Sequence, residues 1–410
     1  MEAGKKMMIV VMDGLGDRAV KELGYKTPLQ VAKKPNLDWF AQNGTSGSMD
    51  VIGPGIRPGS DTSHLALLGY DPYEVYTGRG PFEAAGVGLI GQKGDIAFRC
   101  NFATVDPKMN VMDRRAGRIK EPDTTELVKA LQGLKVAGIE AIVKDATEHR
   151  AVLLLRGEGL DPHVSDADPH AIAKVQLSKP LVPGAQRTAE AVNEFVKRSF
   201  EILDAHPVNI RRREQGLLPG NILLPRGGGP FPDIEPFEKR YGMKGSCVAG
   251  VSLIKGIGRV VGLEIVDVPK GSGGTGTDMV AKARIALKEL ERKDFVLMNV
   301  KASDVVSHDG DPRRKIEVIE RLDGMAKVLR EGLPEGAVIA FCADHCTPVA
   351  RFDHSGDPVP LTIYSETSIK DGVQSYDEVS CAKGALGRIR GKDLMPILYD
   401  RADRSEKFGA

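Results

Sequence analysis

Short apolar runs recur along the chain and predict buried strands. Residues 7–12 read Met-Met-Ile-Val-Val-Met without one polar position, which is typical of a strand covered on both faces. Later runs of the same kind lie at 221–224, 247–251, 295–298 and 337–341. Each is short enough to be a strand rather than a helix.

Amphipathic stretches with helical spacing separate the later strands. The spacing predicts helices over 278–291 and 312–329, and a helical region from Thr27 to Gly44 that is interrupted around Pro35. Gly44 stands where a glycine would end that region. Alternating strands and helices predict an α/β fold, a mostly parallel sheet with helices on both faces.

The middle of the chain has a different pattern. Charged, alternating strands are expected at 95–101, 139–143 and 151–156, beside helical patterns at 123–134 and 189–200. The 410 residues are also too many for one small domain. We therefore expect a core domain formed by residues 1–90 and 206–410, with a smaller α+β domain inserted at 91–205.

Composition narrows the functional classes. Lys and Arg number 57 against 56 Asp and Glu, a net charge of +1, which argues against a nucleic-acid or membrane-surface binder. The five cysteines are sparse and odd in number, which argues against the disulfide framework of a small secreted protein. No apolar run approaches the roughly 20 residues needed to span a bilayer. We expect a cytoplasmic protein, in which the arginine runs 114–115 and 211–213 are solvated.

Acidic and imidazole side chains stand just after several of the predicted strands. In open α/β sheets, binding sites form beyond the carboxyl ends of the strands. The candidate ligands are Asp13, Asp304, His308, Asp344, His345 and His354.

These carboxylates and imidazoles form a donor set suited to Zn²⁺ or Mn²⁺. Two such ions could clamp a phosphoryl group during in-line displacement. A single Asp or His at a strand end could equally cap a helix, and for each residue alone both interpretations stand. For the whole set capping is the weaker interpretation, because Asp304-x-x-x-His308 and the adjacent pair Asp344-His345 are hard to obtain from capping.

A group that accepts the phosphoryl moiety is also present. Ser60, Thr62 and Ser63 lie at the start of a predicted helix, whose N-terminal amides favour anionic oxygen. An activated hydroxyl there could accept a phosphoryl group. The bland alternative is an N-cap formed by Ser60, Asp61 or Thr62. Spacing alone does not choose among the hydroxyls.

Together these motifs resemble a known family over nearly the whole chain. The motifs are Val11–Asp17, Thr27–Leu29, Lys34–Asp38, Pro58–Thr62, Leu68–Pro72, Gly78–Pro81, Asp344-His345 and His354 with Pro358–Pro360. The chain is similar to the archaeal type of cofactor-independent phosphoglycerate mutase, in the alkaline phosphatase superfamily. The resemblance implies an alkaline-phosphatase-like core.

The resemblance also implies roles for individual residues. In related bacterial-type mutases the nucleophilic serine lies four residues before a histidine, as Ser60 does before His64. Ser60 is therefore the implied nucleophile and a metal ligand. The implied ligand sets are Asp13, Ser60, Asp344 and His345 for one ion, and Asp304, His308 and His354 for the other. Manganese is the usual ion, with Zn²⁺, Mg²⁺ or Co²⁺ as alternatives.

The implied reaction interconverts 3-phosphoglycerate and 2-phosphoglycerate, in glycolysis and gluconeogenesis, without 2,3-bisphosphoglycerate. Ser60 takes the phosphoryl group and returns it to the other hydroxyl, while the inserted domain closes against water. The alternative is a metal-dependent phosphohydrolase or another phosphomutase of the same superfamily, and a third possibility is a metal-stabilised binding protein without turnover. The sequence leaves both a monomer and a homo-oligomer open.

Substrate-binding candidates are cationic, because the substrate carries a carboxylate and a phosphate. Arg226, Lys255 and Arg259 are the candidates, and each could instead be an ordinary surface cation. In the insert, Asp168 or His170 could move protons between the glycerate hydroxyls. Their alternative is a loop turn with aspartate caps.

Overall fold

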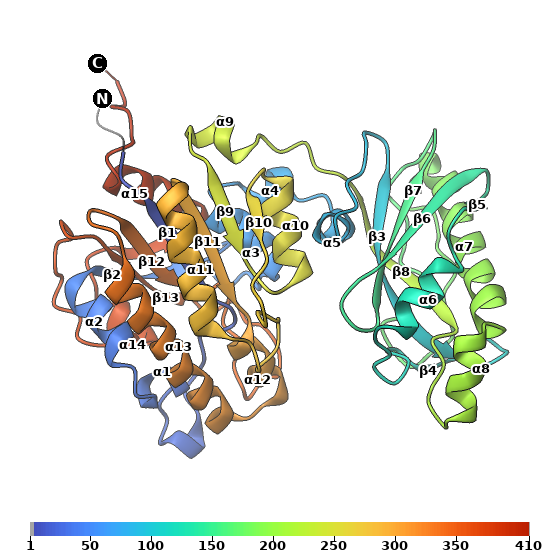
Figure 1. The fold of residues 1–410 in the computed structure, drawn as a ribbon, viewed down its shortest axis with the longest axis horizontal. Coiled ribbons are helices and arrows are strands. Elements are labelled where there is room, and N and C mark those ends of the chain that lie inside the picture. The colour runs from blue at the N-terminus through green and yellow to red at the C-terminus, as the bar shows by residue number, and fades with distance from the viewer. Residues whose placement is uncertain (1–3, 410) are drawn as a thin grey trace. The chain divides into compact units, whose positions relative to one another are not determined.

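The computed structural model describes residues 4–409, which form two compact units (Figure 1). Among the described residues, unit 1 runs up to Tyr76 and resumes at Ile234, and unit 2 is Thr77–Asp233. Residues 1–3 and 410 of the expected core domain lie outside the described residues.

Unit 1 contains one eight-stranded sheet in the order β10-β9-β11-β1-β12-β13-β2-β14. All strands run in one direction except β13, which is antiparallel to both of its neighbours. The strands are β1 (Met7–Met12), β2 (Thr45–Asp50), β9 (Gly245–Val248), β10 (Glu264–Val266), β11 (Phe295–Val300), β12 (Val338–Cys342), β13 (Val359–Tyr364) and β14 (Gly387–Arg390).

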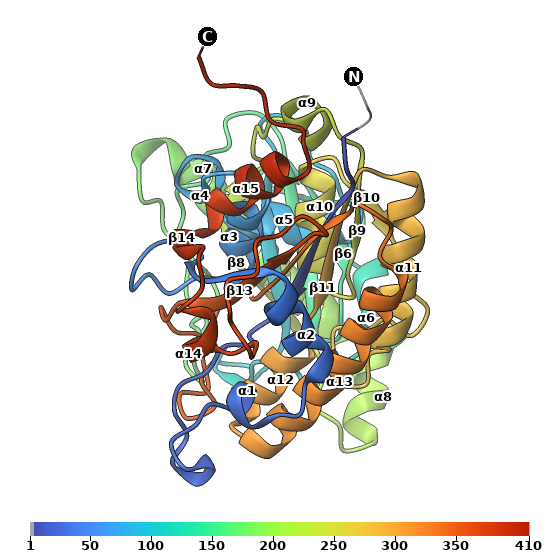
Figure 2. The ribbon, with the colours of Figure 1, turned by 90° about the vertical axis from the view of Figure 1, so that its left-hand side faces the viewer.

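Helices cover both faces of this sheet. They are η1 (Lys21–Leu23), α1 (Pro28–Val31), α2 (Pro35–Asn43), α3 (Ser60–Leu67), α4 (Pro72–Val75), α9 (Phe237–Tyr241), α10 (Ser252–Val260), α11 (Met279–Arg292), α12 (Ala302–Asp309), α13 (Pro312–Gly332), α14 (Glu378–Cys381), η3 (Gly391–Asp393) and α15 (Leu394–Arg401). Helices α11, α13 and α2 pack together on one face, and α3 packs with α10 on the other (Figure 2). The predicted α/β class with a mostly parallel sheet is confirmed.

Several predicted elements of unit 1 are also confirmed. All six residues of β1 are buried, as their unbroken apolar run requires, and the helical region is interrupted between Val31 and Pro35. Gly44 does end α2, but its backbone is extended (φ −106°) rather than left-handed. Glycine is needed there because a Cβ would lie 2.6 Å from the Ile363 carbonyl oxygen.

Unit 2 contains an antiparallel sheet in the order β4-β3-β7-β6-β5, with β8 also paired to β3. Its strands are β3 (Ile96–Val105), β4 (Val111–Asp113), β5 (Leu134–Val136), β6 (Ile139–Asp145), β7 (Arg150–Arg156) and β8 (Ile222–Pro230). Its helices are α5 (Arg79–Gly86), α6 (Asp123–Lys129), η2 (Pro183–Ala185), α7 (Gln186–Asp204) and α8 (Pro207–Glu214).

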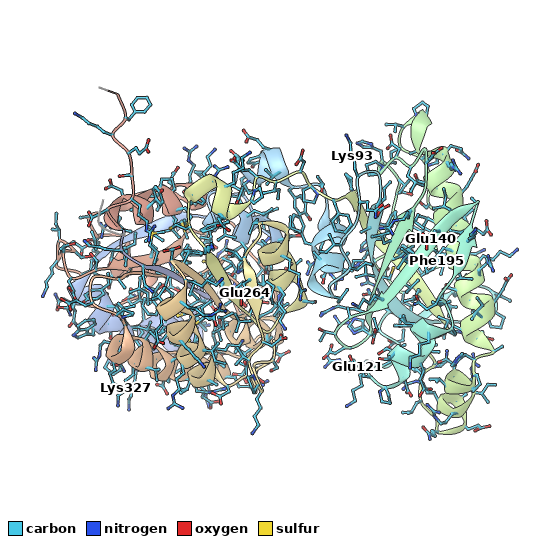
Figure 3. The ribbon with its side chains drawn as sticks, turned by 45° about the horizontal axis from the view of Figure 1, so that its top comes forward. Lys93, Glu121, Glu140, Phe195, Glu264 and Lys327 are labelled. Atoms are coloured by element: carbon cyan, nitrogen blue, oxygen red, sulfur yellow. The ribbon has the colours of Figure 1, made fainter. Side chains whose placement is uncertain are left out.

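The two faces of this second sheet are packed differently. On one face, Phe195 of α7 lies in the main apolar core. Glu140 of β6 belongs to the opposite face and is exposed, as the alternation predicts (Figure 3). On that opposite face, α5 packs on β3, and the buried apolar cluster is small. It consists of Ala84, Ala97 and Val152, with Val87, Leu89 and Phe231 packed against it. That second face therefore has room for polar side chains.

The borders of unit 2 differ from those expected at 90/91 and 205/206. Helix α5 packs on β3 and β8, and β8 pairs with β3 along most of its length, so both belong to unit 2. The run at residues 221–224 was expected in the parallel sheet, and that expectation is wrong. A short apolar run shows that a strand is buried but not which sheet it joins.

The described helices include none that is both long enough and apolar enough to cross a membrane.

Candidate functional site

Three neighbouring parallel strands bring their carboxyl ends to the same edge of the unit 1 sheet. Met12 of β1 is in register with Val300 of β11, and Val11 is in register with Cys342 of β12. Asp13, Asp304 and Asp344 follow these strands within a few residues, and we call them the acidic cluster. All three are 2% exposed or less.

A glycine allows the first two of these loops to approach. Gly14 has φ +65°, and a Cβ there would lie 2.6 Å from the Cβ of Asp304. Its amide donates to Asp344 Oδ1 at 3.0 Å. The turn after β1 therefore touches the segments that carry both of the other acids.

The three histidines direct the same ring nitrogen towards the acidic cluster. His308 Nδ1 is 2.8 Å from the Phe352 carbonyl oxygen and His354 Nδ1 is 2.9 Å from that of Pro58. A carbonyl oxygen only accepts, so each Nδ1 carries the proton. His345 Nδ1 bonds Thr347 Oγ1 at 3.0 Å. Nε2 of each ring is thus left for the cluster, as in a metal ligand held by a neighbouring group.

The ligand atoms fall into two overlapping groups. His308 Nε2 and His354 Nε2 lie 3.4 and 3.6 Å from Asp304 Oδ1. These three residues form one group whose candidate ligand atoms all lie within 4.8 Å of one another. Asp13, Asp304 and His345 form the other under the same limit. Asp304 belongs to both.

Asp344 and Ser60 adjoin the second group through His345. His345 Nε2 is 3.3 Å from Asp344 Oδ2 and 3.2 Å from Ser60 Oγ. Ser60 is the first residue of α3, where free backbone amides and the helix dipole favour negative charge. His64, one turn later, bonds the Ser60 carbonyl oxygen and Asn299 and is fully buried, so it supports the loop.

The acids of the cluster differ in their affinity for protons. Burial raises the pKa of Asp13, and the negative charge of Asp344 raises it further. Burial alone would also raise the pKa of Asp304, but Lys301 and His308 outweigh burial and hold it well below the usual range. His345 lowers the pKa of Asp344 in the same way against the effect of burial. The raised pKa of Asp13 indicates that additional positive charge is favourable beside that carboxylate.

The residues fit divalent cations. Asp344 Oδ2 is buried and accepts no hydrogen bond from any described residue. Such an atom is costly unless something binds it. Together with three imidazole Nε2 atoms and two further carboxylates, it forms a mixed oxygen and nitrogen donor set for ions such as Mn²⁺ or Zn²⁺.

Two lysines around this edge were not among the predicted site residues. Lys301 Nζ lies 3.1 Å from Asp13 Oδ1 and 2.7 Å from Asp304 Oδ2. Lys315, fully buried on α13, pairs with Asp17 Oδ2 at 2.9 Å. A lysine at or near the start of a helix looks solvated in sequence. Only the position of Lys301 three residues before Asp304 could have indicated its role.

Asp168, His170 and Arg226 come together in unit 2. Arg226 Nη1 is 3.2 Å from His170 Nδ1, and Arg226 Nε is 3.8 Å from Asp168 Oδ2. Asp168 is 2% exposed and accepts from the His170 amide at 2.9 Å. His170 also pairs with Asp166 at 2.8 Å.

Further arginines surround these residues on the α5 face of the sheet. Arg99 of β3 is directly opposite Arg226 of β8, and Arg114 Nη2 lies 3.3 Å from Asp168 Oδ2. Buried Glu83 lies between Arg79 and Arg99, 3.1 and 3.9 Å from their Nε atoms. The arginine cluster comprises Arg79, Arg99, Arg114, Arg150 and Arg226.

The arginine cluster is short of acceptors. Nε atoms of Arg99, Arg114 and Arg150 are buried and have no hydrogen-bond partner among the described residues. Burial, and after it the charge of Arg79, lowers the pKa of Arg99 to about 9. Both observations indicate a site that favours an anion. The expectation that the 114–115 run is solvated holds only in part for Arg114, whose side chain is half-buried with a buried Nε. It is wrong for Arg212 of the other run, which is buried against Asp123.

The remaining two candidates lie on α10. Lys255 pairs with Asp267 Oδ1 at 2.6 Å, and Arg259 is one turn further along the helix. Helix α10 packs against α3, which begins at Ser60.

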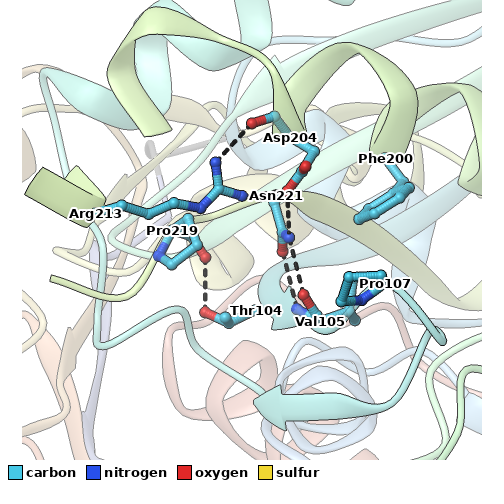
Figure 4. Close-up of a pocket in the computed structure, with 8 residues that line it drawn as sticks. All are labelled: Thr104, Val105, Pro107, Phe200, Asp204, Arg213, Pro219 and Asn221. Carbon is cyan, nitrogen blue, oxygen red and sulfur yellow. Dashed lines mark hydrogen bonds and ion pairs between the residues drawn. The ribbon is translucent and has the colours of Figure 1, made fainter. Parts of the chain in front are cut away.

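A separate pocket of about 400 Å³ in unit 2 contains none of the predicted residues (Figure 4). Its lining residues are Thr104, Val105, Pro107, Phe200, Asp204, Arg213, Pro219 and Asn221. Asn221 bonds Val105 and Asp204, Thr104 donates to the Pro219 carbonyl oxygen, and Arg213 pairs with Asp204. Since these polar groups pair with each other, the pocket offers a ligand little.

The chain is similar in sequence to proteins of one known family. A family model described as 2,3-bisphosphoglycerate-independent phosphoglycerate mutase matches residues 41–209. A protein of that name from Methanopyrus kandleri is 50% identical over 99% of this chain and 98% of its own length. One from Methanocaldococcus jannaschii is 48% identical, covering 99% of both chains.

Solved structures are similar along the whole chain. A protein from Pyrococcus horikoshii matches with a TM-score of 0.87 and 38% identity, covering 99% of this chain and all of the other. A cofactor-independent phosphoglycerate mutase from Thermoplasma acidophilum matches with a TM-score of 0.71 and 38% identity, covering 97% of this chain and all of its own.

Proposed function

The chain belongs to the family of 2,3-bisphosphoglycerate-independent phosphoglycerate mutases, and from this premise we propose that it interconverts 3-phosphoglycerate and 2-phosphoglycerate through a phosphoserine on Ser60. The reaction needs no 2,3-bisphosphoglycerate. As an enzyme of glycolysis and gluconeogenesis, it would act in the cytoplasm.

Two divalent cations, most simply Mn²⁺, complete the proposed site. Asp13, Ser60, Asp344 and His345 would hold one, and Asp304, His308 and His354 the other. Asp344 Oδ2, which is buried and accepts no hydrogen bond from the described residues, and the common direction of the three Nε2 atoms support this assignment. When bound, the cations supply positive charge that stabilises the transferring phosphoryl group.

Ser60 would act as the nucleophile. Its Oγ loses its proton and forms a bond to phosphorus while the bond from phosphorus to the glycerate oxygen breaks. That glycerate oxygen takes up a proton and becomes a hydroxyl. The α3 amides favour negative charge at this position. Return of the phosphoryl group to the other hydroxyl of glycerate completes the isomerisation.

Recognition of glycerate is proposed for unit 2. The three buried Nε donors of the arginine cluster support the binding of a small anion, and Arg226 can hold a carboxylate through two parallel bonds. Asp168 and His170 are the proposed groups that move protons between the glycerate hydroxyls. Lys255 and Arg259 are retained as further substrate-binding candidates.

The observation that carries the mechanism is the Ser60 hydroxyl, 3.2 Å from His345 Nε2 at the start of a helix and beside the acidic cluster. Ser60→Ala should lower conversion of 3- to 2-phosphoglycerate, in an enolase-coupled assay, by at least about 10⁴-fold. Thr62→Val is the matched control. Thr62 Oγ1 bonds only Gly59 among the described residues, so this variant should retain turnover.

Mass spectrometry of the quenched wild-type enzyme should find phosphate on the peptide that contains Ser60. Retained mutase activity in Ser60→Ala would exclude the mechanism. Release of inorganic phosphate by the wild type without isomerisation would instead favour the alternative, a metal-dependent phosphohydrolase.

A further inference from the structure

Lys301 joins the two groups of ligand atoms. It is the residue before α12, directly after β11, and its side chain is 24% exposed. Its Nζ lies 3.1 Å from Asp13 Oδ1 and 2.7 Å from Asp304 Oδ2. Asp13 and Asp304 belong to different proposed ion sites, so a single ammonium contacts one ligand of each.

The two oxygens of Asp304 have separate partners. Oδ1 faces His308 and His354 and accepts from Thr347 Oγ1 at 2.9 Å. Oδ2 is held by Lys301. The ammonium thus leaves one oxygen towards the imidazoles and occupies the other.

Asp13 differs, because one of its oxygens faces both the lysine and an imidazole. Its Oδ2 accepts from Asn299 Nδ2 at 3.2 Å, while Oδ1 lies 3.7 Å from His345 Nε2 and 3.1 Å from Lys301. The contacts of Lys301 therefore tie both carboxylates to one fixed point while each keeps an oxygen near an imidazole.

The Lys301 ammonium changes the charge balance of the buried site. Asp13, Asp304 and Asp344 place three carboxylates within one buried site, and the Lys301 ammonium is 3.1 Å or less from two of them. An ammonium so close lowers the repulsion between the acids when no metal is present. It equally opposes the entry of a further cation, because like charges repel most strongly away from water.

We propose that Lys301 is a positioning residue that acts as a permanent third cation of the site. It stabilises the metal-free acidic cluster, occupies Asp304 Oδ2 so that only Oδ1 faces the imidazoles, and weakens the affinity for divalent ions. The inference rests on the proposed function for its two ion sites, but its consequences for stability and metal affinity do not require turnover.

The test compares Lys301→Met with wild type, using Mn²⁺ titrated into EDTA-treated, dialysed protein by calorimetry and following thermal unfolding. The metal-free variant should melt several degrees lower, because two buried acids lose their counter-charge. Its tightest Mn²⁺ site should bind at least about tenfold more strongly. Lys301→Arg keeps the charge and should restore both values towards wild type.

A metal-free melting temperature equal to that of wild type, or Mn²⁺ affinity equal or weaker, would overturn the inference. If Lys301→Met folds only with Mn²⁺, the inference is supported. If it fails to fold with and without Mn²⁺, and Lys301→Gln fails in the same way, it is refuted. Should wild type bind Mn²⁺ as described yet lack mutase activity, only the proposed function fails.

Discussion

Replacing Lys315 with Met removes the cation that ties two loops of the metal-binding edge together. Its ammonium donates to the carbonyl oxygens of Gly14 (3.2 Å), Gly16 (3.2 Å) and Thr347 (3.1 Å). Its fourth contact is with Asp17 Oδ2, at 2.9 Å. The β1 loop carries Asp13, and the β12 loop carries Asp344 and His345.

The cost follows from what remains after the substitution. Asp17 is 6% exposed and keeps the Val349 and Arg18 amides, but it loses its counter-charge. Breaking a buried ion pair from one side costs about 3–5 kcal/mol. The three carbonyl oxygens also lose a donor, and methionine covers part of the volume without replacing the hydrogen bonds.

The assay uses the single tryptophan. Trp39 lies on α2 in unit 1 and packs on Phe40 and Tyr364, so its fluorescence reports on the unit that contains Lys315. The urea midpoint should fall by about 1–2 M for a loss of this size. Lys327→Met, on the exposed side of the same helix, should change the unfolding free energy by no more than about 0.5 kcal/mol.

A double variant separates the lost charge from lost packing. Adding Asp17→Asn to Lys315→Met removes the unpaired carboxylate and should recover part of the stability. An unchanged midpoint in Lys315→Met, or a double variant less stable than the single one, would refute the argument.

Three further predictions test other parts of the molecule. Gly14→Ala forces a Cβ to within 2.6 Å of the Cβ of Asp304 at a backbone φ of +65°. The variant should lose about 1–3 kcal/mol of unfolding free energy and bind Mn²⁺ more weakly in calorimetry. Unchanged Mn²⁺ affinity would contradict the close approach. Arg226→Lys keeps the positive charge but loses the planar guanidinium that can donate two parallel hydrogen bonds. The KM for 3-phosphoglycerate should therefore rise about tenfold, while the Trp39 unfolding curve stays unchanged. An unchanged KM would argue against bidentate binding. Burial and then Arg150 lower the pKa of His149 from 6.5 to about 3, so folded His149 stays neutral where the unfolded chain takes up a proton. Stability from this group is complete above pH 6.5 and is lost as the pH falls towards 3, by at most about 1.4 kcal/mol per pH unit. His149→Gln should flatten that slope in urea unfolding followed by circular dichroism, and parallel slopes would refute it.

The strand-end positions could be predicted from sequence for a topological reason. Parallel strands present their carboxyl ends at one edge, so Asp13, Asp304 and Asp344 are neighbours however long the connections between them are. The overlap at Asp304 could not be predicted. Membership in two groups depends on where two carboxylate oxygens point, and spacing carries no such information.

The prediction of which sheet one strand joins was wrong for a related reason. The run Ile222–Leu224 reads as a buried strand, and it is one, but it pairs antiparallel with β3 rather than entering the parallel sheet. Apolar pattern reports burial, whereas the partner strand is chosen by long-range contacts. The borders of unit 2 shift with that one strand, because α5 packs on both β3 and β8.

The basic residues were hardest to predict, and their roles share a physical basis. Lys301 donates to the second oxygen of a ligand, and Lys315 donates to backbone carbonyl oxygens of the ligand-bearing loops. A site whose acids must offer oxygens to cations has fewer of those oxygens available for hydrogen bonds from protein donors. Hydrogen bonds to the loop backbone and to the remaining carboxylate oxygens then stabilise the site. A lysine has three N–H donors at the end of a long side chain and can donate to both kinds of acceptor. In sequence such a lysine is indistinguishable from a solvated one, because what separates them is the burial of the acids around it.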